Sequence, residues 1–444
     1  CLSIFLLICF FATAVSAATY YVDQNHSQAS DENPGTEDLP WKTINHAAEI
    51  LKAGDTVLVK AGEYYVGSGS WHCPALNPAN SGTPENYITF KAYPGHEVRL
   101  VADVSAIGSD GRDYIIWDGF IATATCGTVE ERPVAIFNAK GIIVQNCELI
   151  GHYVETTGNH TVVRIENSED IVIRNCVIHG SRGICCSQGI QWYGIKDVLI
   201  EHCHIYDCDW PIMAKSLGCN VTVRYNLIHD CEIGYEGNHN SGGTNPPYPG
   251  CPDRAENIQI YQNIFYACQS NAINLYVNSY NFQIYNNVAY NCKRFISAWQ
   301  KHENHSIWNN IAVMADRIYD FSQVHPETIL NYSDYNNFQS YSTFCTHSYS
   351  IYANTLNEWQ QKTPFDDHSI ESDPLFVNPE AHDFHLRPNS PCLAKEGEDC
   401  GGIDKQDYDG DGDTTERINM GCYITGNEII GPILNQGPQV SNES

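Results

Sequence analysis

Apolar and polar residues alternate in seven similar stretches between Ile142 and Met314. They read IIVQNCELIG from Ile142, IVIRNCVIHG from Ile171, VLIEHCHIYD from Val198, VTVRYNLIHD from Val221, IQIYQNIFYA from Ile258, FQIYNNVAYN from Phe282 and HSIWNNIAVM from His305. Positions one and three are mostly Ile, Val or Phe, a period of two that indicates β-strands and excludes helical repeats. Successive starts lie 29, 27, 23, 37, 24 and 23 residues apart, a period typical of a solenoid whose repeats bury their apolar faces by stacking.

Each coil is expected to contain three strands. A second short strand follows a tight bend within each stretch, and a third apolar segment precedes several of the stretches. These third segments begin at Val162, Gly189, Pro211 and Ala272. Three short strands per coil at this period predict an all-β fold, the parallel β-helix.

Stacked coils turn each repeat position into a column of side chains spaced about 4.8 Å apart. The sixth position holds Cys147, Cys176, Cys203, Asn226, Asn263, Asn287 and Asn310. We expect this column to point inward, with the asparagine amides hydrogen-bonded to one another. A second column, also expected to be inward and structural, holds His152, Ser181, Cys208, Cys231, Cys268 and Cys292.

The two ends of the chain differ in composition from the coils. Residues 1–17 form an apolar stretch that ends in small residues, which predicts a signal peptide. We expect the β-helix to span residues 18–395, with a cap at about 18–66 and regular coils at about 134–315. Residues 396–444 are predicted to form a closing segment with an acidic loop and a tail. No later stretch is apolar enough to span a membrane.

Cysteines are numerous, and their pairing stays open. Of the 19 cysteines, Cys1 and Cys9 lie in the leader, which leaves an odd number for the mature chain. The column positions favour stacked free thiols, since a thiol packs well as a small apolar group. Cysteines near the C-terminal end are better candidates for disulfides: Cys392, Cys400 and Cys422.

The segments that flank the repeats carry further motifs. Between Ala18 and Val66 lie YYVD, NPGT, PWKTINHAAEIL and AGDTVLVKAGEY, and near the C-terminus lie SDPLFVNPEAHDFHLRPNSPC and DYDGDGDTTERINMGCYI. These segments resemble the caps of secreted right-handed parallel β-helix proteins of the pectate-lyase-like superfamily. The resemblance covers most of the chain and implies a right-handed coil, a short N-terminal capping helix and an extracellular location. It says little about activity, because this fold hosts lyases, hydrolases, epimerases and adhesins.

In the lyases of this superfamily the third strand carries the chemistry, so its outward side chains form our candidate site. Lys215 is our candidate for the base that removes the proton α to a uronate carboxylate. Arg164 or Arg182 would stabilise the resulting enolate-like charge. Three aromatic residues suit either stacking on sugar rings or packing in the core: Tyr193, Tyr276 and Trp299.

Acidic side chains accompany this face. Arg182, Asp209 and Glu232 fall on consecutive rungs of one column, and Asp207 and Asp230 each lie two residues before a member of it. Two carboxylates one rung apart beside a cation could hold calcium or share a proton. A surface row of ion pairs is the alternative.

A second candidate calcium site lies in the closing segment. Four aspartates there are spaced like the start of a calcium loop: Asp407, Asp409, Asp411 and Asp413. An EF-hand would require a glutamate where the chain has Ile418. The sequence therefore leaves a partial structural calcium site or a solvated acidic turn.

The interval of 37 residues contains an insertion rich in Gly, Pro and Asn, beside the acidic and third-strand columns. We expect Glu236 and His239, at its root, to reach a bound ligand. A disulfide between Cys231 and Cys251 would close the loop. A loop without function is the alternative.

Charge limits the choice of partner. The formal net charge is −29, which argues against nucleic acid and repels an acidic polysaccharide unless calcium or a local basic patch intervenes. Three functions remain: a polysaccharide lyase that acts by β-elimination, a glycoside hydrolase, and a non-catalytic surface or adhesion protein. We favour the lyase, secreted and monomeric.

Overall fold

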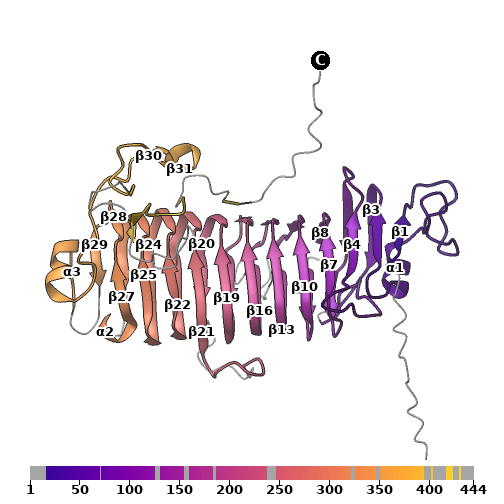
Figure 1. Ribbon diagram of the computed structural model, residues 1–444, viewed down its shortest axis with the longest axis horizontal. Helices are drawn as coiled ribbons and strands as arrows, with labels where there is room; N and C mark the ends of the chain where they lie inside the picture. Colours follow the sequence, from indigo (N-terminus) through magenta and orange to yellow (C-terminus); the bar gives the residue numbers. More distant parts are fainter. Residues whose placement is uncertain are drawn as a thin grey trace, which may run out of the picture.

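The strands form an elongated solenoid with helices at its two ends (Figure 1). A computed structural model of the chain describes residues 17–70, 72–125, 131–154, 160–183, 187–237, 247–321, 326–346, 351–394, 402–403, 417–423 and 430–431. Within these ranges 27 strands join into one continuous sheet that winds around the solenoid, and all pairings between its coils are parallel. Three faces of this winding sheet are called here the first, second and third sheets.

The first sheet contains the strands with the strictest apolar alternation. Their order is β1 (Thr19–Val22), β2 (Thr56–Val59), β4 (Ile88–Ala92), β7 (Ile115–Asp118), β10 (Lys140–Gln145), the second halves of β13 (Thr161–Arg174) and β16 (Gln188–Glu201), β19 (Gly218–Arg224), β21 (Ala255–Tyr261), β23 (Gln283–Tyr285), β25 (His305–Trp308) and β27 (Leu330–Asp334). The register places Ile142, Ile171, Val198, Val221 and Ile258 side by side, as the repeat predicts.

The second sheet follows each of these strands after one sharp bend. Its strands are β3 (Gly62–Gly67), β5 (Val98–Ala102), β8 (Ile121–Ala124), β11 (Glu148–Ile150), β14 (Val177–His179), β17 (His204–Tyr206), the beginnings of β20 (Leu227–Gly237), β22 (Ile264–Tyr280), β24 (Val288–Glu303) and β26 (Ile311–Asp320), and β28 (Asn337–Gln339).

The third sheet closes the triangle of each coil. It contains β6 (Ser105–Asp110), β9 (Arg132–Phe137), the first halves of β13 and β16, β18 (Trp210–Ala214), the later parts of β20, β22, β24 and β26, and β29 (Thr343–Thr346). One continuous hydrophobic core fills the space that the three sheets enclose. The fold class predicted from the repeats is therefore confirmed, with three strands per coil.

Many of the described bends between sheets use a residue with positive φ, a conformation that asparagine and aspartate tolerate better than most residues. At the bend between the third and first sheets these residues are Asp170, Asp197, Asn220, Asn257, Asn281 and Asn304, with φ between 52° and 65°. The side chains also hydrogen-bond along the bend, since Asn220 donates to Asp197 over 2.8 Å and Asn257 donates to Asn220 over 3.3 Å.

The predicted asparagine column lies inside the coil, next to the bend between the first and second sheets. Asn226, Asn263, Asn287 and Asn310 are fully buried, and each donates its side-chain amide over 3.0 Å to the amide oxygen of the next asparagine. The last acceptor is Asn336, which donates to the buried carboxylate of Asp366 over 3.1 Å. The column therefore runs one rung further than the seven stretches indicate and ends on an acid.

Both cysteine columns are also inward. Cys147, Cys176 and Cys203 continue the asparagine column, and a second column is formed by Cys208, Cys231, Cys268 and Cys292, all of them buried. Burial raises the pKa of Cys147, Cys176, Cys208, Cys231 and Cys292, so these thiols remain protonated. His152 departs from its column: its side chain is 39% exposed and its Nδ1 lies 3.2 Å from Glu131.

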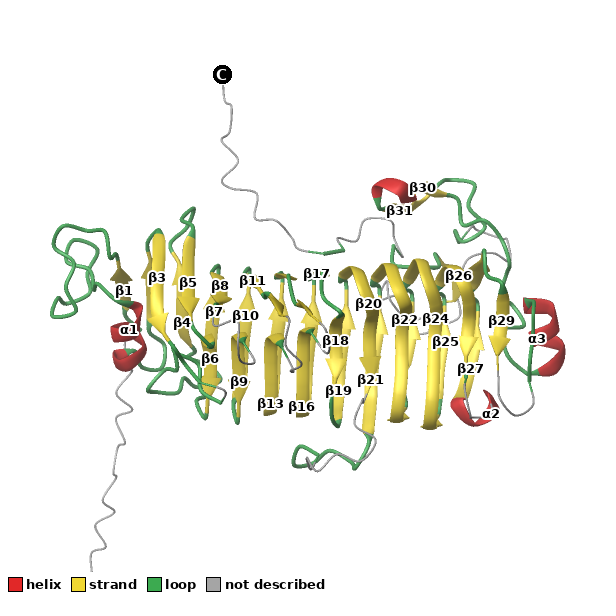
Figure 2. Ribbon diagram, turned by 180° about the vertical axis from the view of Figure 1, so that it is seen from behind, coloured by secondary structure: helices red, strands yellow, loops and turns green. Residues whose placement is uncertain are grey.

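The two ends of the core are covered differently (Figure 2). Helix α1 (Ile44–Ile50), capped by the Thr43 hydroxyl, buries Ile44, Ala47 and Ala48 against the first coils, as predicted for the capping helix. At the other end lie α2 (Pro326–Ile329) and α3 (Leu356–Lys362). No helix in the described ranges combines the length and apolar character needed to cross a membrane.

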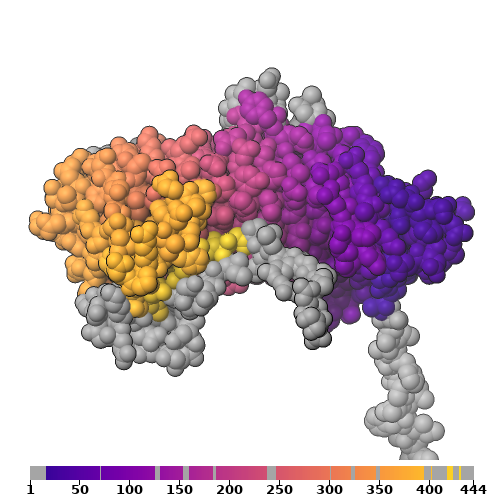
Figure 3. All heavy atoms as spheres, turned by 90° about the horizontal axis from the view of Figure 1, so that it is seen from above, coloured from indigo at the N-terminus to yellow at the C-terminus, as the bar shows by residue number. Residues whose placement is uncertain are grey.

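The chain from Phe376 to Leu386, which precedes the predicted closing segment, packs on the outside of the second sheet. It contains β30 (Phe376–Asn378), the 3-10 helix η1 (Pro379–Ala381) and β31 (Asp383–Leu386). Phe376 and Phe384 lie with Met420 against Ile264, Val288 and Ile311, which point out of the coil. Figure 3 shows this segment, in orange, as a raised block on the C-terminal coils. Two short pairs complete the described strands: β12 (Tyr153–Val154) with β15 (Arg182–Gly183), and β32 (Gly402–Ile403) with β33 (Arg417–Ile418).

Candidate functional site

One row of outward side chains on the third sheet is polar and yet buried. The inward neighbours Ile190, Ile212, Tyr235 and Ile273 are in register, so the residues that follow them form the next row. That row reads Arg164, Gln191, Met213, Glu236, Asn274 and Ser297, each at most 6% exposed. This register places Glu236 in the same outward row as Gln191, and it places Lys215 two residues after Met213 along the chain.

Arg164 is held in a fixed position by three neighbours. Its Nε donates to Glu166 over 2.6 Å, its guanidinium donates to the Gln191 amide oxygen, and its carbon Cζ lies 4.0 Å from the centre of the Tyr193 ring. A cation stacked on an aromatic ring and paired with a carboxylate loses little conformational entropy when it binds an anion. The structure thus brings Arg164 and Tyr193 together. Glu166 was not predicted, although its spacing of two from Arg164 could have indicated it.

Two of the predicted carboxylates lie on neighbouring rungs at the bend between the second and third sheets. The Glu232 amide donates to the Asp209 carbonyl over 2.9 Å. Burial raises the pKa of Asp209. Burial also raises the pKa of Glu232, and the nearby negative charges of Asp209 and Glu236 raise it further. Three carboxylates therefore share one negative environment, which favours binding a cation or a proton.

Glu236 belongs to both the polar row and this acidic group. It is 2% exposed, and it accepts a hydrogen bond of 2.8 Å from the side-chain amide of Asn274, one rung away. Buried polar side chains joined in this way keep a fixed orientation. Glu236 thus lies in the outward row where the sequence predicted it.

Arg182, Asp207 and Asp230 form a neighbouring group, and the positive charge of Arg182 opposes the rise in the pKa of Asp209. The Arg182 guanidinium pairs with the Asp207 carboxylate and donates to the Asp230 carbonyl, and the Asp230 carboxylate lies 2.8 Å from His229 Nδ1. Across the described parts of the chain, no three His, Cys, Asp or Glu side chains are arranged to hold a metal ion. The four predicted metal ligands thus divide between two groups, and a calcium ion on Asp209 and Glu232 stays a prediction.

Lys215 and the predicted aromatic residues share the next outward row of the third sheet. The Lys215 amide donates to the Trp192 carbonyl over 3.1 Å, which sets Lys215 one rung from Tyr193. Further along the same row the rings of Tyr276 and Trp299 stack 5.9 Å apart, and Trp299 is 43% exposed. The solenoid therefore aligns a base candidate with an aromatic surface that suits a sugar ring.

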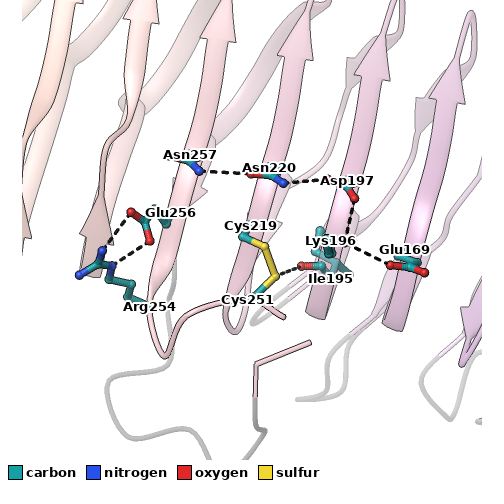
Figure 4. The surroundings of a disulfide bond; sticks show 10 residues. All are labelled: Glu169, Ile195, Lys196, Asp197, Cys219, Asn220, Cys251, Arg254, Glu256 and Asn257. Carbon is teal, nitrogen blue, oxygen red and sulfur yellow. Dashed lines mark hydrogen bonds and ion pairs between the residues drawn. A yellow bond between two sulfur atoms is a disulfide. The ribbon is translucent and has the colours of Figure 1, made fainter. Parts of the chain in front are cut away.

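The prediction for the insertion was wrong in its disulfide. Cys251 pairs with Cys219, not with Cys231 (Figure 4). Cys231 points into the core, where its sulfur lies 3.4 Å from that of Cys268, whereas Cys219 begins a first-sheet strand at the edge of the coil. Among the end candidates, Cys392 is a buried thiol that accepts a hydrogen bond from Asn337.

Several predicted residues lie outside the described ranges. They are Cys400, His239, Asp407, Asp409, Asp411 and Asp413. Their proposed roles in disulfide formation, ligand binding and calcium binding stay predictions.

Comparisons with known proteins agree with this architecture. Residues 133–312 match the family model of the right-handed β-helix region. The fold is similar to the crystal structure of pectate lyase Pel9A, with a TM-score of 0.56 and 12% identity over 92% of this chain and 97% of that one. It is also similar to the GH136 lacto-N-biosidase from Eubacterium ramulus, with a TM-score of 0.49 and 15% identity over 80% of this chain and 67% of that one.

One further likeness is in sequence. A stretch of 78 residues is 36% identical to the protein YwoF of Bacillus subtilis (strain 168); it spans 18% of this chain and 14% of that protein. The chain therefore has a right-handed parallel β-helix fold.

Proposed function

We propose that the chain is an extracellular polysaccharide lyase that cleaves an acidic polysaccharide by β-elimination on the third sheet. The observation that carries the proposal is the pair of outward rows on this sheet. They align Lys215 with the stacked Tyr276 and Trp299, beside the fixed Arg164 and the acidic group of Asp209, Glu232 and Glu236. Cation, base candidate and sugar platform thus lie along one side of the solenoid.

The proposed reaction uses these side chains in order. Lys215 Nζ takes the proton from the sugar carbon next to the uronate carboxylate. The electron pair of that C–H bond forms a double bond to the neighbouring ring carbon, whose bond to the glycosidic oxygen breaks. The leaving oxygen keeps the bond's electron pair and takes a proton from water. Arg164 or Arg182 stabilises the charge that develops on the carboxylate.

Calcium would complement the acidic group. Asp209 and Glu232 supply carboxylate oxygens on neighbouring rungs. Burial raises the pKa of both groups, and the charges of Asp209 and Glu236 raise that of Glu232 further, so a cation would stabilise their ionised forms. Such a pair provides a minority of the six to eight oxygen ligands that calcium takes, so sugar and water oxygens would complete the set. When bound, the ion would neutralise part of the substrate's negative charge and so reduce its repulsion by the acidic protein.

A glycoside hydrolase is the second candidate. It is favoured by the raised pKa of Asp209 and Glu232, since hydrolysis of a glycosidic bond uses one protonated and one ionised carboxyl group. A non-catalytic surface or adhesion protein would use the same rows for binding alone.

Two assays separate these functions. Polygalacturonate, alginate, a glycosaminoglycan and a neutral glucan are incubated with the protein, and ultraviolet absorbance and reducing ends are measured together. A lyase raises both signals on an acidic polymer, and a chelator lowers its rate. Reducing ends without absorbance would indicate a hydrolase. The absence of both signals would contradict catalysis on these polymers.

An extracellular location is part of the proposal. The disulfide between Cys219 and Cys251 supports it, because such bonds persist mainly in oxidising compartments. The apolar N-terminal residues 1–17 fit a signal peptide. We also expect a monomer, which size-exclusion chromatography with light scattering tests.

A further inference from the structure

A second groove runs along the outer surface of the first sheet. Its volume is about 600 Å³. Its floor contains Val172, Leu199, Thr222 and Gln259, which occupy one outward row on four successive rungs. The buried interior of the coil separates this groove from Lys215 and the third sheet, so the two sites are independent.

One wall of the groove contains Arg224 and Tyr261, and it is backed by a buried stack of aromatic rings. Arg224 pairs with Glu201 over 2.7 Å and donates to the Tyr261 hydroxyl over 2.9 Å. The Tyr261 ring stacks on Tyr285 with centroids 4.7 Å apart, and Tyr285 stacks on Trp308 at 4.4 Å. The wall thus combines a fixed guanidinium with the edge of Tyr261, and the buried rings behind it hold both in place.

The opposite wall is the bend between the third and first sheets, shown in Figure 4. Asp197 and Asn220 line it, joined by a hydrogen bond of 2.8 Å. The disulfide joins the segment that contains Cys251 to β19 beside Asn220. This wall is therefore covalently fixed at the edge of the groove.

Charges around the groove are compensated within the protein. Asp197 lies 3.3 Å from Lys196 Nζ, which also lies 3.6 Å from Glu169, and Arg224 is paired with Glu201. An anionic ligand would therefore meet no positive charge in excess. Amides, a hydroxyl and apolar side chains instead suit a neutral ligand with many hydroxyl groups and apolar ring faces.

We propose that this groove is a non-catalytic binding site for a neutral polysaccharide in an extended conformation. Because successive rungs lie about 4.8 Å apart, an extended chain can run along the floor and contact Val172, Leu199, Thr222 and Gln259 in turn. The site goes beyond the proposed lyase activity and does not depend on it. It would hold the protein on a mixed polysaccharide while the third sheet acts on an acidic component.

Titration calorimetry with cellohexaose, xylohexaose and mannohexaose tests the proposal on the full-length Lys215→Ala protein. The variant Thr222→Arg fills the floor of the groove. Ser306→Arg is its control, because Ser306 occupies the same outward row three rungs away and is not among the residues that line the groove. We expect at least one of the three sugars to bind, and Thr222→Arg to weaken its binding at least about tenfold, whereas Ser306→Arg changes it less than about twofold.

Three outcomes would overturn the proposal. The first is that none of the three neutral sugars binds, and the second is that both arginine variants lose the same binding affinity. The third is that hexagalacturonate binds instead and that Thr222→Arg alone weakens its binding. Failure of the lyase assay would leave this test unaffected, because binding is measured without turnover. Thermal melting of both variants checks that each is folded.

Discussion

The bend between the first and second sheets and the bend between the second and third sheets are built from the same repeat, yet they differ in what they hold. Next to the first bend, Asn226, Asn263, Asn287 and Asn310 repeat one residue type whose amides satisfy one another. At the second bend, Asp209 and Glu232 stand on neighbouring rungs with the pKa of both carboxyl groups raised. A column that repeats stabilises the coil, whereas a column that changes at each rung places different functional groups side by side.

The largest effect on stability is expected at the repeating column. Asn287→Ala removes an amide that donates to Asn310 and to the carbonyls of Ile260 and Tyr285, and whose oxygen accepts from Asn263. Because each buried group left without a partner costs about 1–3 kcal/mol, we expect a loss of at least about 3 kcal/mol. Chemical denaturation measures it.

Asn304→Ala is the matched control for this prediction. Asn304 is exposed at the bend between the third and first sheets, with φ of 65°. Its replacement should cost about 1–2 kcal/mol, the penalty for a left-handed alanine. Equal losses in the two variants would contradict the special role of the inner column.

The acid at the end of the column predicts a pH dependence. Burial raises the pKa of Asp366 from 3.8 to about 6, although Ser333, Asn336, Trp359 and Ser369 donate hydrogen bonds to it. Between these pH values the folded state binds more protons than the unfolded state. Its stabilising contribution is therefore complete below pH 3.8 and is lost as pH rises through about 6, by up to about 3 kcal/mol.

Denaturation of the wild type and of Asp366→Asn across pH 3.5–7 measures this contribution. Other carboxyl groups titrate in both proteins, so the difference between the two curves isolates Asp366. We expect the wild type to lose stability relative to the variant as pH rises. A difference that is constant with pH would show that Asp366 keeps an ordinary pKa.

A smaller effect is expected at the aromatic platform. Trp299→Ala removes a half-exposed ring that stacks on Tyr276. Since such a contact contributes about 0.5–1.5 kcal/mol, KM should rise about two- to tenfold with little change in kcat or melting temperature. The control Tyr352→Ala removes a ring that is 50% exposed near α3. An unchanged KM in Trp299→Ala would remove this residue from the sugar site.

Much of the fold could be predicted because its information is local and periodic. Alternation at period two identified the strands, and the spacing of the stretches aligned Asn226 with Asn263 and Asn287. The column's continuation to Asn336 was missed because Asn331 and Ser333 stand where the repeat has apolar residues, although Asn336 and Asn337 form an asparagine pair like that of Asn309 and Asn310. The final contact with Asp366 could not be predicted, because this residue lies beyond the repeat.

The candidate site could be predicted less completely. Outward alternation on the third sheet identified Arg164 and Glu236, and the register then fixed Lys215 relative to Tyr193. The partner of Cys251 was assigned wrongly, because sequence spacing does not show where a long insertion returns to the solenoid. Cys219 lies at that edge, whereas Cys231 is held inside by its column.

The most direct test of the proposed activity compares two lysines on different sheets. Lys215→Ala removes the base candidate from the third sheet, and Lys91→Ala removes a lysine of the first sheet that pairs with Asp118 over 2.9 Å. The rate of double-bond formation on the best acidic polymer is measured for both variants by ultraviolet absorbance. A general base predicts a loss of at least about 100-fold in Lys215→Ala and an unchanged rate in Lys91→Ala. Equal rates in both variants would contradict the role of Lys215 as the base.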